Sequence, residues 1–357
     1  MSAPTTSSTS STTSSSVSSP AGRTAAVEPV PTGVQTLPFA KAINAGLRAA
    51  LESNPNSLLM GEDIGALGGV YRITEGLLAD FGADRVMDTP LAESGIIGTA
   101  IGLSLRGYLP ICEIQFDGFV FPGFNQITTQ LAKMHSRSEG TLSAPVVIRI
   151  PYGGGIGSIE HHSESPEALF AHTAGLRIIT PSNPQDAYWM IQQAVESKDP
   201  VIVFEPKRRY WLKGEVDTSA PASDPFTAQV VREGTDATIV AYGPLVPVAL
   251  AAAAAAEEDG RSVEVVDLRS ISPIDFDTVT ESVRKTGRLI VTHEAPTFGG
   301  IGGEIAARVA ERAFLSLEAP VLRVGGFHMP YPVAKVEEHY LPDIDRLLEA
   351  LDRSFAY

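Results

Sequence analysis

Hydrophobic positions along this chain fall into short blocks with two alternating spacings, beginning at residue 37. The first block has the interval of a helix face, at Phe39, Ile43, Leu47 and Leu51. Compact apolar runs typical of buried strands follow at 58–60, 85–88, 109–116, 146–150, 177–180 and 201–204. Helical spacings lie between them at 96–105, 124–134, 165–172 and 185–195. Strands that alternate with helices predict a parallel sheet covered on both faces.

The alternation stops between residues 213 and 226, where small and polar residues and two prolines are typical of a linker. Strand-like runs resume at 238–241, 263–267, 289–291 and 321–324, and helical spacings at 245–256, 304–314 and 344–351. The pattern therefore predicts an α/β protein of two doubly wound parallel-sheet domains, at 37–215 and 229–357, joined by a linker at 216–228. Ligands of such sheets bind beyond the carboxyl ends of the strands, so residues that follow strands are the candidates for a site.

Composition narrows the function classes. Residues 1–36 are rich in Ser and Thr, so we expect a disordered tail that lacks the basic and apolar regions of a signal peptide. The 27 Lys and Arg against 42 Asp and Glu give a net charge of −15, which disfavours nucleic acid and anionic membranes as partners. No apolar stretch is long enough to span a bilayer. The single cysteine, Cys112, excludes an internal disulfide and fits a reducing compartment, so we expect a cytoplasmic protein.

Two glycine-rich stretches invite a nicotinamide-binding interpretation that their spacing does not support. The stretch 153–157 follows a strand-like run but lacks the third glycine of the dinucleotide fingerprint, which favours a loop that closely approaches another group. The stretch 298–303 also lacks the spacing, and we interpret it as helix–strand packing or a turn. A nicotinamide oxidoreductase is therefore disfavoured.

His161 and His162 are adjacent, without the spacing of a zinc site, and we predict no metal ligands in this chain. The Gly-x-Ser-x-Gly elbow of the serine hydrolases is also absent from the sequence. A histidine that closely follows a glycine-rich loop is well placed for proton transfer near neutral pH. From this position alone, however, we favour a structural hydrogen bond as the role of the histidine.

Glu93 follows the strand-like run 85–88 and opens a helix rich in small residues. The helix dipole stabilises an acid at such a position without any further role. However, Leu91, Ile96 and Ile97 nearby are apolar, and an acid in apolar surroundings needs a partner. The residues alone leave both interpretations open.

A series of motifs resembles the β subunit of the 2-oxo acid dehydrogenases. In chain order they are Gly-Glu-Asp-Ile at 61–64, Gly-Gly-Val-Tyr-Arg-Ile-Thr at 68–74, Asp-Thr-Pro-Leu-Ala-Glu at 88–93, Glu-Ile-Gln-Phe-Asp at 113–117, Pro-Gly-Phe-Asn-Gln-Ile at 122–127, His-Ser at 162–163 and Phe-Glu-Pro-Lys at 204–207. The pieces at 113–116 and 204–207 most resemble the branched-chain enzyme. The resemblance implies a transketolase pyrimidine-binding domain followed by a transketolase C-terminal domain.

This family uses thiamine diphosphate, whose aminopyrimidine ring shifts to an imino form when a carboxylate binds the ring nitrogen. The resemblance assigns that carboxylate to Glu93, with Leu91 beneath the ring and Phe119 stacked on it. Gln115 lies close by, and Glu62 joins the acid network at the subunit interface. Branched-chain relatives often carry Tyr where this chain has Phe119, which weakens the substrate assignment.

His162 matches the family's active-site histidine, which serves proton transfer while the acyl group passes to lipoamide. Glu164 stands where many relatives have Gln, and an acid there would raise the imidazole pKa if the two groups were close. Relatives also hold potassium through backbone carbonyls, here near Val146 and Asp199, a type of site that leaves no trace in the side chains.

The Gly-Asp-Gly stretch with which single-chain thiamine enzymes hold magnesium and the diphosphate does not occur in this sequence. The diphosphate still needs a metal and donors. The resemblance therefore implies an α subunit that holds Mg²⁺, in an α₂β₂ heterotetramer with thiamine diphosphate shared at each α–β interface.

We thus expect the β subunit of the decarboxylating component of a branched-chain 2-oxo acid dehydrogenase. It would carry out oxidative decarboxylation of a 2-oxo acid and reductive acylation of lipoamide, with the lipoyl acyltransferase core as a further partner. The alternatives in the same class are the pyruvate and acetoin dehydrogenases. A non-catalytic assembly subunit is an alternative of another class, but bracing a partner requires neither Glu93 nor His162.

Overall fold

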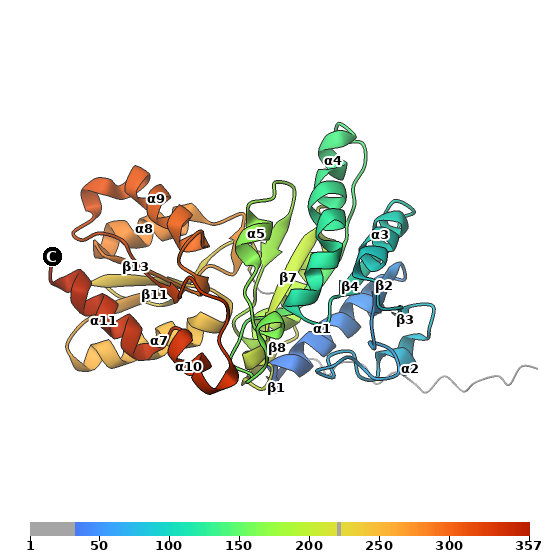
Figure 1. The fold of residues 1–357 in the computed structure, drawn as a ribbon, viewed down its shortest axis with the longest axis horizontal. Helices are drawn as coiled ribbons and strands as arrows, with labels where there is room; N and C mark the ends of the chain where they lie inside the picture. The colour runs from blue at the N-terminus through green and yellow to red at the C-terminus, as the bar shows by residue number, and fades with distance from the viewer. Residues whose placement is uncertain (1–32, 220–222) are drawn as a thin grey trace, which may run out of the picture.

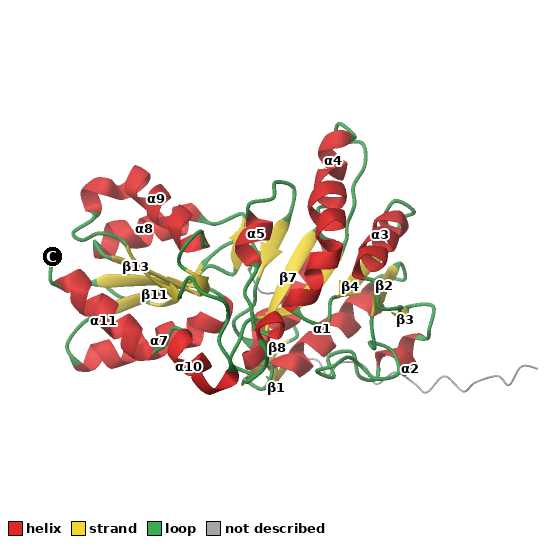
Figure 2. Ribbon diagram, in the orientation of Figure 1, coloured by secondary structure: helices red, strands yellow, loops and turns green. Residues whose placement is uncertain are grey.

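The computed structural model describes residues 33–219 and 223–357, so the predicted tail up to residue 32 lies outside the described residues. Two lobes stand side by side, each with a sheet between layers of helices (Figures 1 and 2). The predicted fold of two mainly parallel α/β sheets is confirmed.

The first sheet has seven strands in the order β12-β6-β7-β5-β4-β2-β3. Their bounds are β2 Ser57–Gly61, β3 Val86–Asp88, β4 Leu109–Glu113, β5 Val147–Tyr152, β6 Arg177–Ile179, β7 Val201–Pro206 and β12 Ser270–Ser272. All pair in parallel except β12, which runs antiparallel to β6. The register sets Gly61 opposite both Asp88 and Glu113, so the carboxyl ends of β2, β3 and β4 are level.

Helices cover both faces of this sheet. α1 (Phe39–Ser53) and α6 (Pro184–Glu196) pack together on one face, where the apolar stripe of α1 is fully buried. The other face is covered by α3 (Glu93–Ser104), by α5 (Glu167–Ala171) and by a helical stretch that ends in α4 (Met134–Arg137). That stretch, predicted as one helix, instead begins with a π-helical turn at Gln126–Gln130 and a 3₁₀ turn at Leu131–Lys133.

The second sheet has five strands in the order β14-β13-β10-β11-β9. Their bounds are β9 Gln229–Arg232, β10 Ala237–Ala241, β11 Val263–Asp267, β13 Leu289–Pro296 and β14 Leu322–Gly326. All pair in parallel except β9, which is antiparallel to β11. Figure 1 shows the helices of one face, α8 (Phe276–Thr286) and α9 (Ile301–Ala313), and of the other, α7 (Val246–Glu258) and α11 (Ile344–Phe355). The short helix α10 (Glu337–Tyr340) precedes α11.

Two predicted boundaries are wrong: the end of the N-terminal tail and the start of the linker. Val34–Pro38 forms β1, which pairs antiparallel with β8 (Lys213–Asp217). The last residues of the predicted tail and the first of the stretch read as a linker are therefore ordered strands. Neither stretch has the apolar content of a core strand, so the pairing was not visible in the hydrophobic pattern. The short helix α2 (Leu77–Phe81) was also not predicted.

The two lobes are joined by more than the connecting chain. Strand β12 belongs to the second half of the sequence but extends the first sheet. Beside it the buried guanidinium of Arg269 donates to Asp186 at 2.9 Å, at the start of α6. Within the described residues, no helix is both long and apolar enough to cross a membrane.

Candidate active site

Three of the predicted site residues meet beyond the level ends of β2, β3 and β4. Glu62 directly follows β2, Gln115 lies two residues after β4, and Glu93 opens α3 after the β3 connection. Each of the two carboxylic acids is only 7% exposed. Burial raises the pKa of Glu62, and the nearby charge of Glu93 raises it further. The sheet therefore brings together two acids that interact electrostatically.

Only some of the polar side-chain atoms of Glu62 and its neighbour Gln115 have hydrogen-bond partners within the chain. Glu62 Oε1 is buried and has no hydrogen-bond partner among the described residues. Gln115 Nε2 donates to Asp63 Oδ2 at 3.0 Å and weakly to the Glu62 carbonyl oxygen at 3.4 Å. A buried acceptor without a donor is unfavourable unless another molecule supplies one.

The surface beside Glu93 is open and apolar. Leu91 is 81% exposed, which is unusual for a leucine next to a buried carboxylate. An adjoining cavity of about 580 Å³ is lined by Met87, Pro90, Ala92, Ile96 and other residues around the start of α3. An exposed apolar surface of this kind is typical of a binding interface.

Phe119 and His162 form a second group, together with Phe116. The imidazole of His162 stacks on the Phe116 ring with centroids 4.0 Å apart and 24° between planes. It meets Phe119 edge-on at 5.1 Å. These ring contacts hold the imidazole plane in one orientation.

The hydrogen bonding of His162 selects one neutral tautomer. Its Nδ1 lies 3.0 Å from the carbonyl oxygen of His161, so Nδ1–H donates and Nε2 keeps a free lone pair. Partial burial lowers the pKa of His162, and the charge of Lys207 contributes. Glu164 does not contribute to the pKa of His162, and the acid whose charge raises it is Glu160. A neutral imidazole with a free Nε2 can accept a proton near pH 7.

The 3₁₀ helix η1 (Asp117–Gly123) connects the two groups. At its start, a Cβ added to Gly118 would lie 2.3 Å from the His161 carbonyl oxygen, so glycine is required for this close approach. At its end, a Cβ added to Gly123 would lie 3.3 Å from the Glu93 carbonyl oxygen. Phe119 stands between these contacts. One short element therefore sets the spacing of the histidine loop and the start of α3.

The glycine-rich loop 153–157 binds the second lobe, as its interpretation as a close-approach loop predicted. Its Gly157 N–H donates to Glu337 Oε1 at 2.8 Å, and Gly154 N–H donates to Glu294 Oε1. A Cβ added to Gly154 would overlap Tyr331 Oη. The backbone donors are occupied by carboxylates of the chain itself, which argues against a dinucleotide phosphate at this position. The second glycine stretch packs α9 on His293 of β13, also as predicted.

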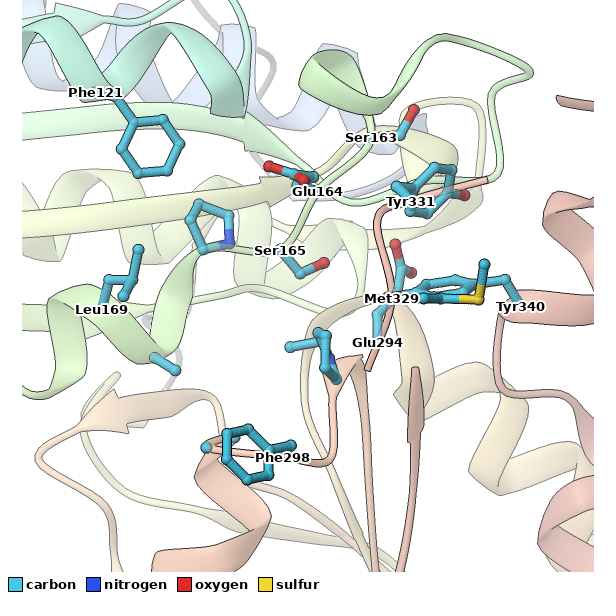
Figure 3. A pocket seen from close by; sticks show the side chains of 16 residues that line it. Phe121, Ser163, Glu164, Ser165, Leu169, Glu294, Phe298, Met329, Tyr331 and Tyr340 are labelled. Atoms are coloured by element: carbon cyan, nitrogen blue, oxygen red, sulfur yellow. The ribbon is translucent and has the colours of Figure 1, made fainter. Parts of the chain in front are cut away.

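A cavity of about 220 Å³ opens between the lobes beside the histidine loop (Figure 3). Ser163 and Glu164, which directly follow His162, line one side. Phe298 and Tyr331 line the side that belongs to the second lobe. The carboxylate pair of Glu62 and Glu93 lies outside it. Among the described residues no group of three or more His, Cys, Asp or Glu side chains is arranged to hold a metal ion.

Two buried charge clusters were missed by the sequence reasoning. Arg149 donates to Glu205 at 2.6 and 3.0 Å and to Glu113 at 2.5 Å, and Asp117 pairs with Lys207. Four of these five residues lie in or beside the quoted motifs 113–117 and 204–207. Charged residues at the ends of apolar strands were the available signal, since such side chains are buried only with partners.

Comparison with known protein families identifies both domains of the chain. Residues 35–211 match the family described as "Transketolase, pyrimidine binding domain", and residues 227–347 match "Transketolase, C-terminal domain". A solved structure described as "Split gene transketolase, inactive beta4 tetramer" has the same fold, with a TM-score of 0.75 and 24% identity over 89% of this chain and 98% of that one.

Two curated relatives are more similar in sequence than this solved structure. The β subunit of the pyruvate dehydrogenase E1 component from Leifsonia xyli is 64% identical, covering 93% of this chain and 98% of its own. The β subunit of 3-methyl-2-oxobutanoate dehydrogenase from Mycobacterium tuberculosis is 51% identical, covering 89% and 92%. The chain belongs to the family of E1 β subunits of the 2-oxo acid dehydrogenases, which depends on thiamine diphosphate.

Proposed function

We propose that this chain is the β half of a 2-oxo acid decarboxylating enzyme that works only with an α subunit, in an α₂β₂ heterotetramer. The observation that carries the proposal is the buried pair of Glu62 and Glu93 beside an exposed apolar surface at the strand ends. Such a pair would be unfavourable in a chain that only braced a partner. The net charge of −15 and the single free cysteine agree with a cytoplasmic complex.

The residues fit thiamine diphosphate. Glu62 Oε1 lacks a donor, and Leu91 and Phe119 offer apolar surfaces on which a ring can lie. In this proposal Glu93 binds the pyrimidine nitrogen, with Gln115 and Glu62 in the surrounding polar network. When bound, the cofactor supplies the nucleophilic carbon that attacks the 2-oxo group and accepts the electron pair left by carbon dioxide.

Glu93 would hold the proton shared with the ring nitrogen. Its burial strengthens this interaction, because the effective dielectric constant is lower than in water. Burial and the nearby charge of Glu93 both raise the pKa of Glu62, so Glu62 is the neighbour suited to carry a proton in this network.

His162 would move a proton during acyl transfer to the lipoyl group. In this transfer one lipoyl sulfur would bond to the acyl carbon as the S–S bond breaks, and the other sulfur would become a thiolate. The bond between the acyl carbon and the cofactor would break and leave its electron pair on the cofactor. The acyl hydroxyl loses its proton as the carbonyl forms, and the thiolate gains one. Neutral His162, with its free Nε2, can take the first proton and deliver it to the thiolate.

The diphosphate and Mg²⁺ would be held by the α subunit, since this sequence contains no Gly-Asp-Gly stretch. The acyl acceptor would be a lipoyl group of an acyltransferase core. Both are proposals about partners of the assembled enzyme.

Two substrates are candidates. The motifs at 113–116 and 204–207 favour a branched-chain 2-oxo acid, and the 51% identical relative is named for 3-methyl-2-oxobutanoate. The 64% identical relative is named for pyruvate, and Phe119 in place of Tyr also weakens the branched-chain assignment.

The two candidates can be separated by co-expressing this chain with the α subunit and assaying the assembled enzyme. The quantity compared is kcat/KM for pyruvate and for 3-methyl-2-oxobutanoate. A preference of tenfold or more assigns the substrate, since each tenfold corresponds to about 1.4 kcal/mol of discrimination. Absence of decarboxylation of every 2-oxo acid by the assembled pair would contradict the proposed function.

A further inference from the structure

Asp117 and Lys207 form an ion pair from which water is completely excluded, since both side chains are 0% exposed. Asp117 begins η1, and Lys207 begins the turn η5 (Lys207–Arg209) directly after β7. Burial raises the pKa of Asp117 to about 6, while Lys207 opposes the rise. Desolvating two charges costs several kcal/mol per ion, and apolar residues would often serve stability equally well. The pair therefore calls for an explanation other than stability.

Both members of the pair also bind the backbone that carries His162. Lys207 Nζ donates to the His162 carbonyl oxygen at 2.6 Å. Asp117 Oδ2 accepts the N–H of Glu164 at 2.9 Å. One ion pair thus holds two backbone groups of the histidine loop, the carbonyl of His162 itself and the N–H of Glu164 two residues later.

The same pair supports the ring that orients the imidazole. Lys207 Nζ lies 5.6 Å from the centre of the Phe116 ring, on which His162 stacks. The tight contact of Gly118 with His161 also prevents the loop from moving toward η1. Backbone, ring plane and loop spacing are therefore all fixed around the buried pair.

We propose that Asp117 and Lys207 are positioning residues that hold His162 in the orientation needed for proton transfer to the lipoyl sulfur. Neither residue contacts the reacting groups in this account, and both act through His162. The inference rests on the proposed function and deepens it. It predicts that losing the pair impairs acyl transfer more than decarboxylation.

The test compares two rates in the enzyme assembled with its α subunit. One is decarboxylation with 2,6-dichlorophenolindophenol as electron acceptor, which bypasses the lipoyl group. The other is acylation of a lipoylated domain. In Lys207→Met the acylation rate should fall at least tenfold further than the dye-linked rate. The control, Lys285→Met, removes a lysine that pairs with Glu233 and Glu264 in the other lobe, and it should leave the ratio of rates unchanged.

Amide hydrogen exchange gives a readout that does not depend on activity. Loss of the pair should speed exchange at the Glu164 amide at least tenfold, measured on a peptide spanning 160–166. Peptides from β10 and β11 should exchange as in the wild type. A role confined to general stability would instead speed exchange throughout the chain.

Asp117→Asn keeps the side-chain size and decides the question if Lys207→Met does not assemble. The inference is overturned if both rates fall equally in the variant that assembles, or if exchange at Glu164 is unchanged. A wild-type pair that decarboxylates no 2-oxo acid would instead overturn the proposed function, so the two failures are distinguishable.

Discussion

Glu167 shows how a single buried acid makes the contact between the lobes depend on pH. It lies at the start of α5 and accepts a hydrogen bond from Tyr242 of the second lobe at 2.8 Å. Complete burial raises its pKa to about 8, and the charges of Glu294 and Asp117 add to the rise. The folded protein therefore holds a proton on Glu167 that the unfolded chain releases at its ordinary value of about 4.5.

We predict that Glu167→Gln flattens the pH dependence of stability. Because the folded-state pKa is raised, the contribution of Glu167 is fully present below about pH 4.5 and declines as the pH rises toward about 8. The amide stays neutral throughout, so the variant should gain stability relative to the wild type as the pH rises through this window. Urea unfolding at several pH values measures the difference in the free energy of unfolding. Parallel plots of this free energy against pH for the two proteins would refute the raised pKa.

At the scale of elements, β1 is the first strand of the described residues and pairs with β8. We predict that a truncation starting at Gly33 changes the free energy of unfolding by less than about 1 kcal/mol, the size of a typical single mutation. The Ser- and Thr-rich segment it removes offers almost no apolar side chains to bury.

A truncation starting at Phe39 is the matched comparison. It removes the five-residue strand β1, leaves the β8 backbone unpaired and exposes part of α1. It should destabilise the chain by more than 1 kcal/mol in the same urea assay. Equal stability of the two truncations would show that β1 contributes nothing.

The hydrophobic pattern was sufficient for the central strands and for most of the long helices, because burial gives them continuous apolar runs or a clear helical stripe. It missed α8, although that helix has an apolar stripe. It was also insufficient for the antiparallel edge strands. Strands β9 and β12 are short and antiparallel, and β12 joins a sheet formed by the other half of the chain. Such pairings depend on tertiary contacts that no local spacing encodes.

The candidate site also has residues whose grouping the sequence could predict and contacts that it could not. Glu93, Glu62 and Gln115 could be assigned to one network from the family motifs, and the structure brings them together because all three follow parallel strands whose ends are level. The stacking of His162 on Phe116 and the ion pair of Asp117 with Lys207 could not, because they join segments up to 90 residues apart. The family motifs contained these residues but did not reveal their contacts.

At the scale of the whole molecule, the proposed active site is divided between this chain and an α subunit. The buried pair of acids and the apolar surface at Leu91 lie on this chain, whereas the diphosphate clamp is assigned to another. We predict that the isolated chain, titrated with thiamine diphosphate in the presence of Mg²⁺ by calorimetry, shows no strong binding. The assembled α–β pair should bind under the same conditions. Micromolar binding by this chain alone would contradict a divided site.

The most direct test of the central claim is hydrogen–deuterium exchange at the thiazolium carbon of thiamine diphosphate bound to the assembled Glu93→Gln enzyme. The amide preserves size and packing at the start of α3, but it removes the anion that stabilises the protonated ring nitrogen. Positioned acid–base groups commonly contribute about 10² to 10⁴-fold, so exchange and turnover should both fall at least 10²-fold. If both persist near the wild-type rate, Glu93 is only an acid at a helix start, and the assignment of this active site is wrong.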